Sequence, residues 1–451
     1  MSRKPKQGLR FQPSCGQQQK GPVPGQKQVL EIERLAHDGR GIAFVDGRSW
    51  FVSGALPGEK VRVRVLAARS KVVDAAAERI EQASVERIEP FCPLAGTCGG
   101  CTLQHMPLEQ QRLFKQELVA EQLQRAGVVV GHWHPPLVAD DRGYRRRSRL
   151  AVKVEKNGSL SFGYREEGSQ RIVDIEQCPV LAPELQAVLP ELAAFVRTLQ
   201  QPRAIGHLEL FAGNSVALLV RLTANIRDAE QQSWRDFAAR MQVQLWWQAE
   251  DEPQPDQADS QLSYRLHDQG LDIDCRPGDF VQVNAALNQL MVNRALEWLG
   301  VQAGDKVLDL FCGLGNFSLP LAQQAASVTA VEGVEGMVMR AGMTAQRQGL
   351  DNVYFVARDL SQPLTGAGWA KQKYDLIVLD PPRDGAQQVI SKLARFGARH
   401  VLYVSCNPAT LARDAALLTG QGYRLAQACS LDMFSHTGHV EAMALFVNTA
   451  R

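Results

Sequence analysis

The chain has 451 residues, 45% of them hydrophobic and 22% charged, as expected of a soluble globular protein with about two to four domains. No run approaches the roughly 18 apolar residues of a membrane span, and the N-terminus has no apolar stretch suited to a secretion signal. The net charge of +2 points to no particular partner. We therefore expect a cytoplasmic protein that does not contact membranes.

The N-terminal segment is basic and of low complexity. Residues 1–30 carry six Lys or Arg and no acid, among many Gln, Pro and Gly. This composition predicts a disordered basic arm over residues 1–26. A solvated tail without any partner fits the same composition equally well.

Residues 27–88 alternate apolar and polar side chains between the turn signals Asp38–Gly39, Asp46–Gly47 and Pro57–Gly58. Several short strands in such a length predict a small antiparallel β-barrel. The segments DGRGIAFVDG, ALPGE and KVRVRV resemble the TRAM domain, an OB-like module, which implies RNA binding. A barrel that only packs on its neighbours is the alternative. The basic side chains that favour RNA contact are Arg40, Arg48, Lys60, Arg62, Arg64, Arg69 and Lys71.

Nine cysteines without a signal peptide argue against a disulfide scaffold and for a reducing compartment. Cys92, Cys98 and Cys101 are spaced C-x5-C-x2-C in a glycine-rich loop, and Cys178 precedes a proline much later. Three close thiolates and a remote Cys-Pro suit a [4Fe–4S] cluster, while an all-cysteine zinc site is the alternative. Either would organise a central α+β domain over residues 89–278, with a helix at about 108–126.

An arginine-rich segment, residues 141–149, lies within this central domain and reads DRGYRRRSR. Guanidinium groups and the ring of Tyr144 suit contacts to phosphates and bases. A solvated loop is the alternative, but the preference for Arg over Lys favours RNA.

Residues 279–451 alternate strand and helix patterns, which predicts a doubly wound, Rossmann-like α/β sheet. The strand VLDLF runs into Gly313 and Gly315, whose spacing fits an S-adenosylmethionine (AdoMet) loop better than a dinucleotide loop. Glu332 ends the next strand, where a carboxylate would bind ribose hydroxyls. Asp359 and Asp380 follow two further strands. These strand ends predict an AdoMet-dependent methyltransferase.

The last motifs narrow the chemistry. VLYVSCNP places Cys406 at a strand end, and GHVEAMALF contains Glu441. Together with DFVQVN, LFCGLGNF, VEG and LDPPR, these motifs resemble the RNA uracil-5-methyltransferase family over nearly the whole chain. An aromatic residue in place of Arg383 would instead have suggested amino-group methylation. The resemblance implies a nucleophile, Cys406, and a general base, Glu441. The AdoMet contacts that it implies are Gln282, Phe311, Asn316, Glu332, Asp359 and Asp380.

The TRAM-like start and the four cysteines resemble the branch of the family that acts on 23S ribosomal RNA. This implies a monomer that methylates C5 of one uridine after Cys406 adds to C6. Three alternatives stay open at this point. They are the same chemistry on transfer RNA, a non-catalytic RNA-binding or ribosome-assembly factor, and a redox enzyme that uses the cluster.

Overall fold

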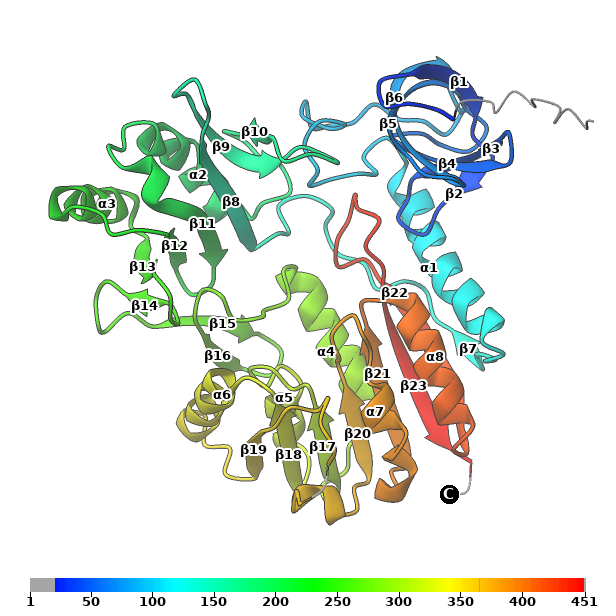
Figure 1. The fold of residues 1–451 in the computed structure, drawn as a ribbon. Helices are drawn as coiled ribbons and strands as arrows, with labels where there is room; N and C mark the ends of the chain where they lie inside the picture. The colour runs from blue at the N-terminus through cyan, green and yellow to red at the C-terminus, as the bar shows by residue number, and fades with distance from the viewer. Residues whose placement is uncertain (1–20, 365, 450–451) are drawn as a thin grey trace, which may run out of the picture. The chain divides into compact units, whose positions relative to one another are not determined.

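The computed structural model describes residues 21–364 and 366–449, which divide into two compact units between Val85 and Glu86 (Figure 1). Each unit has its own hydrophobic core. Most of the basic arm expected over residues 1–26 lies outside the described residues. In the part of the chain that the structure describes, we find no helix with the length and apolar character needed to cross a membrane.

The first unit is a curled six-stranded sheet with the order β1-β5-β6-β4-β3-β2. Its strands are β1 (Lys27–Glu31), β2 (Arg34–Leu35), β3 (Gly41–Val45), β4 (Arg48–Ser53), β5 (Lys60–Ala68) and β6 (Val72–Gln82). The strand β5 turns its valines inward and its basic side chains outward, as period-two alternation requires. One pair departs from the expected antiparallel pattern, because β4 runs parallel to β6.

The basic side chains of this unit are less free than the sequence suggested. Arg62 pairs with Glu81 at 2.8 Å, and Arg64 pairs with Glu78 at 3.2 Å. Arg40 and Arg69 both reach Asp74. These acids lie on the neighbouring strand β6, so pairing across the sheet partly neutralises the predicted RNA-contacting surface.

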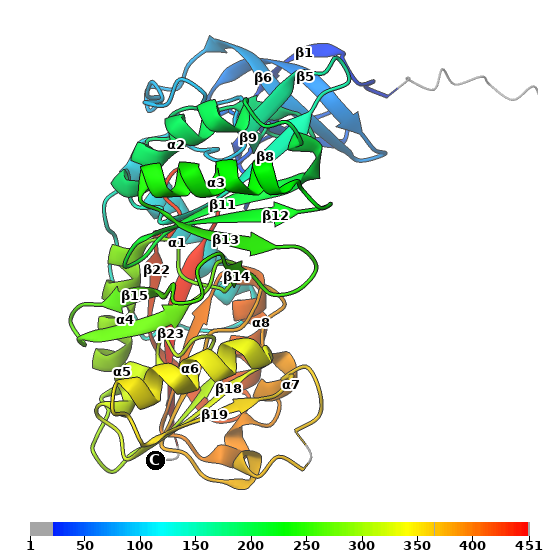
Figure 2. The same ribbon diagram turned by 90° about the vertical axis from the view of Figure 1, so that its left-hand side faces the viewer.

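The second unit contains a seven-stranded sheet with the order β10-β9-β8-β11-β12-β13-β14. Helices α2 (Pro183–Val196) and α3 (Asp228–Met241) share one core cluster with this sheet (Figure 2). The strands are β8 (Arg147–Val154), β9 (Leu160–Arg165), β10 (Ile172–Asp174), β11 (Ile205–Ala212), β12 (Val216–Leu222), β13 (Gln244–Gln248) and β14 (Gln254–Pro255). A short 3-10 helix, Pro202–Ala204, precedes β11.

An eight-stranded sheet forms the rest of this unit, with the order β19-β18-β17-β20-β21-β23-β22-β7. Its first five strands are parallel, whereas β23 is antiparallel to both neighbours. The strands are β7 (His132–Trp133), β17 (Lys306–Leu310), β18 (Ser327–Glu332), β19 (Val353–Ala357), β20 (Leu376–Leu379), β21 (His400–Ser405), β22 (Tyr423–Leu431) and β23 (Glu441–Asn448).

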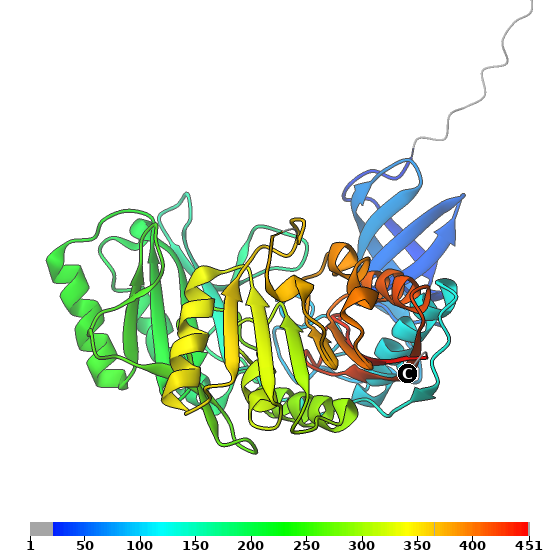
Figure 3. The same cartoon turned by 90° about the horizontal axis from the view of Figure 1, so that it is seen from below.

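Helices cover both faces of this sheet (Figure 3). One core cluster contains α4 (Ala285–Leu299), α5 (Ser318–Ala322), α6 (Glu335–Arg347) and the hairpin of β15 (Leu262–Leu266) and β16 (Leu271–Cys275). The other cluster contains α1 (Leu108–Arg125), α7 (Gln387–Ile390) and α8 (Pro408–Thr419), with 3-10 turns at Trp369–Lys371 and Leu393–Phe396. Nearly continuous apolar strands such as LIVL are explained by this burial on both faces.

Two elements within the predicted central domain, residues 89–278, pack with the eight-stranded sheet. The strand β7 pairs in parallel with β22, His132 opposite Gln427 and Trp133 opposite Ala428. The helix α1 packs its Val119 and Leu123 into the same core cluster as α8. These pairings join segments about 300 residues apart, so no local pattern could indicate them.

Candidate active site

The strand order of the eight-stranded sheet reverses at β17, and the space outside the carboxyl ends of its strands there is called the crevice below. From β17 the sheet continues to β18 and β19 on one side and to β20 and β21 on the other. Ligands of open α/β sheets bind outside the carboxyl ends of the strands at such a point. The loop after Leu310 and the loop after Leu379 are neighbours there, because these two residues are paired in the ladder.

The glycine loop is held open by its own backbone and by Glu332. Phe311 has φ 63°, and Gly313 and Gly315 have φ 57° and 88°, so three residues of the loop are left-handed. A Cβ on Gly315 would come within 3.0 Å of Leu319, which explains the need for glycine. Glu332 accepts hydrogen bonds from the N–H groups of Gly313 (3.1 Å), Gly333 (2.7 Å) and Val334 (3.0 Å). The carboxylate therefore lies at the loop, as the sequence predicted for a ribose contact.

Asn316, in the glycine loop, and Gln282, just before α4, each have hydrogen-bond partners that the sequence did not indicate. The amides of Asn316 and Asn288 exchange two hydrogen bonds of 2.9 Å, and the hydroxyl of Tyr264 donates to Asn316 Oδ1 at 3.3 Å. Gln282 is buried, and its carbonyl accepts a 2.7 Å bond from Arg146 Nε. Asp359 stands apart from this network, because it is exposed after β19 and accepts from Ser361 N at 2.8 Å.

Three carboxyl groups around the crevice have raised pKa values. Burial raises the pKa of Asp309 and of Asp380 to about 7 and that of Glu441 to about 8. Asp309, which sequence reasoning passed over inside the strand VLDLF, is fully buried and accepts a 2.5 Å bond from Ser318. Asp309 Oδ1 and Glu441 Oε2 have no partner among the described residues. Such a concentration of carboxyl groups favours a cationic cofactor such as a sulfonium.

The turn that carries Cys406 is ordered by side-chain hydrogen bonds. Asn407 caps α8 through a 3.1 Å bond from Ala409 N, and Ser405 Oγ accepts from Asn407 N at 3.1 Å. The Asn407 amide also donates to the carbonyl of Arg383 at 3.0 Å, as does the Thr410 hydroxyl at 3.2 Å. The LDPPR loop and the SCNP turn are thus tied together, and Cys406 is left half-buried at the carboxyl end of β21.

Strand pairing brings Cys406 and Glu441 to the same place. Ser405 on β21 is opposite Ala442 on the antiparallel β23. Cys406, which follows Ser405, therefore lies beside Glu441, which precedes Ala442. Burial raises the pKa of the Cys406 thiol, the charges of Glu441 and Asp380 raise it further, and Arg383 opposes them. Burial and the two carboxylates outweigh Arg383, so the thiol is less acidic here than a free cysteine thiol.

A buried ion pair holds the loop that leads into β23. Lys115 on α1 donates to Asp432 at 2.7 Å and to the carbonyl of Phe434 at 2.9 Å, although its side chain is only 1% exposed. Gln111, one turn earlier on α1, accepts from His436 N at 2.9 Å. The His436 ring hydrogen-bonds Asp141 at 2.9 Å and thus has a structural partner.

We expect Lys115→Met to destabilise the fold by about 3 kcal/mol, because it leaves the buried carboxylate of Asp432 with Arg112 as its one cationic partner beside the Ser435 hydroxyl. Urea unfolding of the variant and of wild type measures the difference. Arg125→Gln is the matched control, since it breaks an exposed pair with Glu121 on the same helix and should cost at most about 1 kcal/mol. Equal losses in the two variants would contradict the structural role of Lys115.

The four cysteines predicted to bind a cluster are gathered in one region. Cys92, Cys98, Cys101 and Cys178 are half-buried, and burial raises the pKa of Cys101 to about 11, with the other three thiols adding to the shift. Gln104 bonds both Cys101 and the N–H of Cys92. Among the described residues, no three His, Cys, Asp or Glu side chains converge as one metal ion requires. A zinc ion needs every sulfur at about 2.3 Å, whereas a cubane cluster spreads its ligands over four corners.

The arginine-rich segment divides into buried and exposed members. Arg147 pairs with Glu209 at 3.0 Å, and Arg146 is only 5% exposed. Arg142 and Arg149 are exposed, and the Arg142 guanidinium lies 4.1 Å from the ring centre of Phe91. The expectation of five arginines that contact RNA is therefore too simple, because each of them makes an intramolecular contact. Arg145 Nε donates to the carbonyl of Arg147 at 3.0 Å, and Arg149 shares Glu209 with Arg147.

The doubly wound sheet, the glycine loop and Glu332 define the class of protein, an AdoMet-dependent methyltransferase. The family model described as tRNA (Uracil-5-)-methyltransferase matches residues 136–449, and the TRAM domain model matches residues 23–77. The chain therefore belongs to the RNA uracil-5-methyltransferase family and carries a TRAM domain, which confirms both resemblances.

Full-length relatives and a solved structure agree with this assignment. A Pseudomonas putida protein named 23S rRNA (uracil(1939)-C(5))-methyltransferase RlmD is 53% identical over 446 residues, 98% of this chain and 99% of that relative. The Pseudomonas aeruginosa protein of the same name is 52% identical over 443 residues, 98% of each chain. The crystal structure of Pyrococcus abyssi tRNA (uracil-54, C5)-methyltransferase in complex with S-adenosyl-L-homocysteine has a TM-score of 0.72 at 25% identity. It covers 93% of this chain and 99% of that one.

Proposed function

We propose that this enzyme methylates C5 of one uridine in 23S ribosomal RNA, at the position equivalent to uridine 1939 of its relatives. The observation that carries the proposal is 53% identity extending over 98% of the chain, TRAM domain and cysteine region included. Transfer RNA is the second candidate, because the Pyrococcus abyssi enzyme of the same fold is named for it, although at 25% identity.

The test is to map 5-methyluridine in 23S rRNA and in transfer RNA from cells that lack the gene. Loss at one 23S position, restored by the wild-type gene, is expected. Loss in transfer RNA alone would favour the second candidate. A purified protein that binds RNA but not AdoMet would instead support a non-catalytic assembly factor. The monomeric state and the cytoplasmic location stay predictions.

The proposed reaction uses the thiol and the carboxyl group that the β21–β23 pairing brings together. The thiolate of Cys406 adds to C6 of uracil, and the electron pair released toward C5 takes the methyl group from the sulfonium of AdoMet. S-adenosylhomocysteine is left. Glu441 then removes the proton from C5, and the C6–S bond breaks to regenerate the thiolate. The uridine must leave its stack, or lie in an unpaired loop, to reach both groups.

The raised pKa of Glu441, about 8, supports its part in this reaction. A carboxylate at an ordinary pKa would be a weak base toward a carbon-bound proton, and burial makes Glu441 stronger. Asp380 and Glu332 are proposed to contact AdoMet from two strand ends, and Phe311 and Asn316 from the glycine loop. Gln282 and the exposed Asp359 complete the set by resemblance to the family.

The cysteine region is proposed to hold a [4Fe–4S] cluster through Cys92, Cys98, Cys101 and Cys178. Support comes from their half-burial, their mutual proximity and the bond from the Tyr164 hydroxyl to the Cys178 thiol. When bound, the cluster would cross-link residues 92–101 to residue 178 and thereby order the region that precedes α1. The six expected AdoMet contacts and the proposed thiol and base all lie beyond residue 278, so the proposed role is structural or RNA-positioning rather than redox.

Anaerobically purified wild-type protein is expected to contain about four iron and four sulfide per chain, and Cys178→Ser to lose most of both. Cys429→Ser, a buried cysteine of β22, is the matched control and should keep the metal content. Zinc in place of iron, at one ion per chain, would overturn the cluster and favour the tetrahedral site.

A further inference from the structure

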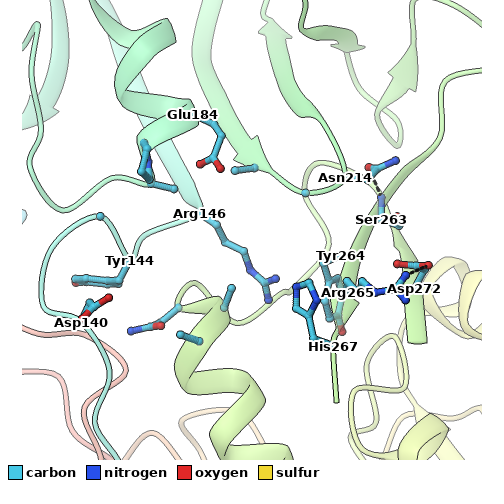
Figure 4. Close-up of a pocket in the computed structure, with 18 of the residues that line it drawn as sticks. Asp140, Tyr144, Arg146, Glu184, Asn214, Ser263, Tyr264, Arg265, His267 and Asp272 are labelled. Carbon is cyan, nitrogen blue, oxygen red and sulfur yellow. Dashed lines mark hydrogen bonds and ion pairs between the residues drawn. The ribbon is translucent and has the colours of Figure 1, made fainter. Parts of the chain in front are cut away.

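A second pocket of about 520 Å³ lies in the same unit as the crevice but is lined by other residues (Figure 4). Its wall comes from the arginine-rich loop, the start of α2, the end of β11, the β15–β16 hairpin and the first turn of α4. None of the six expected AdoMet contacts lines it. Two buried side-chain nitrogens of its wall, on Arg146 and Asn284, have no hydrogen-bond partner among the described residues.

Arg146 is the first donor. Figure 4 shows its guanidinium reaching to the middle of the pocket wall, beside Tyr264 and His267. Its Nε donates to the carbonyl of Gln282, and its charge lies 4.7 Å from the ring centre of Tyr264. Only 5% of Arg146 is exposed, yet its Nη2 has no hydrogen-bond partner among the described residues. A buried guanidinium nitrogen without an acceptor is costly, so an acceptor is expected from a ligand.

Asn284 is the second donor, and the α4 N-terminus adds two more. Asn284 is fully buried and caps the helix, because its Oδ1 accepts from Leu287 N at 3.0 Å. Its Nδ2, however, has no partner in the described parts of the chain. Ala285 and Ala286 follow in the exposed first turn, where backbone N–H groups have no carbonyl partner within the helix. The 15-residue helix also directs the positive end of its dipole here.

The acidic residues of the pocket do not repel an anion from its floor, which is formed by Arg146, Asn284 and the first turn of α4. Asp272 is paired with Arg265 at 2.6 Å, and Asp140 and Glu184 are exposed at the rim. In Figure 4 Asp140 and Glu184 lie on the side of the pocket away from the Arg265–Asp272 pair. The unpaired groups at the floor are therefore all donors, one of them cationic, and this arrangement suits the several acceptor oxygens of a phosphate.

We propose that this pocket binds a backbone phosphate of the RNA substrate, at a nucleotide other than the one that is methylated. The inference rests on the proposed function and adds a subsite to it. Arg146 would hold the phosphate with Asn284 and the first turn of α4. The same arginine contacts Gln282, and Tyr264 contacts Asn316, so an occupied pocket would steady the wall of the AdoMet crevice through two hydrogen bonds.

The test compares Asn284→Asp and Asn284→Ser with wild type in methylation of a 23S rRNA fragment at several salt concentrations. Both substitutions keep a good helix cap, but Ser removes the Nδ2 donor and Asp also repels a phosphate. KM for RNA is expected to rise roughly tenfold or more in Asn284→Asp, and less in Asn284→Ser, with kcat changed little. The slope of log KM against log salt should fall by about 1 in Asn284→Asp.

Arg197→Gln is the control for loss of charge, because Arg197 caps α2 and bonds only Glu176 and the carbonyl of Ala193. It should leave KM within twofold. Binding of S-adenosylhomocysteine shows whether each variant is folded. If Asn284→Asp does not fold, the KM of Asn284→Ser decides the test. Unchanged KM and salt slope in a folded variant would overturn the subsite. The subsite would also be overturned if inorganic phosphate stabilised wild type but not the variants against heat, while the kinetics with RNA stayed the same in all of them. Wild type that fails to methylate RNA would instead contradict the proposed function.

Discussion

Cys406→Ala is expected to lower C5 methylation by roughly four orders of magnitude or more, the scale seen when a covalent nucleophile is removed. Without addition of the thiolate, C5 of uracil is too electron-poor to take a methyl group from a sulfonium. The half-buried turn holding Cys406 is maintained by Ser405 and Asn407, so the variant should still fold. Transfer of a radiolabelled methyl group from AdoMet to an RNA fragment measures the loss.

Two controls separate chemistry from binding in this experiment. Cys406→Ala should bind S-adenosylhomocysteine with wild-type affinity, because the glycine loop and Glu332 are untouched. Cys429→Ala removes a fully buried thiol from β22 and should methylate at a rate close to that of wild type. Methylation at C5 retained by Cys406→Ala would end the covalent mechanism.

Glu441→Gln is expected to stop the reaction one step later. The amide has nearly the shape of the carboxyl group but cannot remove the C5 proton, so the enzyme should remain joined to methylated RNA through the C6–S bond. A protein–RNA band that survives a denaturing gel and carries the labelled methyl group is the expected result. Turnover without such a band in Glu441→Gln would assign the base to another group.

The pH dependence follows from the direction of the two pKa shifts. The pKa of Glu441 is raised to about 8, so the carboxylate fraction, and with it the rate at which the wild-type adduct collapses, should rise between about pH 7 and 9. Adduct formation should also rise with pH, because burial raises the pKa of Cys406. Glu441→Gln isolates the second effect, since only adduct formation occurs in it. Rapid-quench measurements of the two rates check both statements, and a collapse rate independent of pH would contradict the first.

Local patterns were sufficient for those parts of the fold that adjacent residues specify. The helix expected at about 108–126 is present as Leu108–Arg125, and the glycine loop follows β17 as predicted. In the strand KVRVRV, valines face inward because side chains alternate along any strand. Burial on both faces explains why LIVL and VLYV could be recognised without any partner in view.

Long-range packing decided the rest. Within residues 89–278, predicted as a central domain, α1 and β7 pack on α8 and β22, which lie about 300 residues further along the chain. The five arginines of residues 141–149 looked alike in sequence, yet Arg146 and Arg147 are bound inside the protein and Arg149 is exposed. Lys115 gave no signal at all, since a lysine at 1% exposure requires a carboxylate that only the tertiary structure supplies.

The sequence by itself therefore indicated the family and the residues predicted to react, and the tertiary structure decided how those residues are arranged. Cys406, Glu441 and the strand-end residues are recognisable because each occurs in a short motif with a fixed neighbour. Their convergence depends on the antiparallel pairing of β21 with β23, and the basicity of Glu441 depends on burial beside Asp380. Adjacent residues specify neither the register of β21 against β23 nor the low-dielectric surroundings of Glu441. Both arise only when distant segments exclude water from the same space.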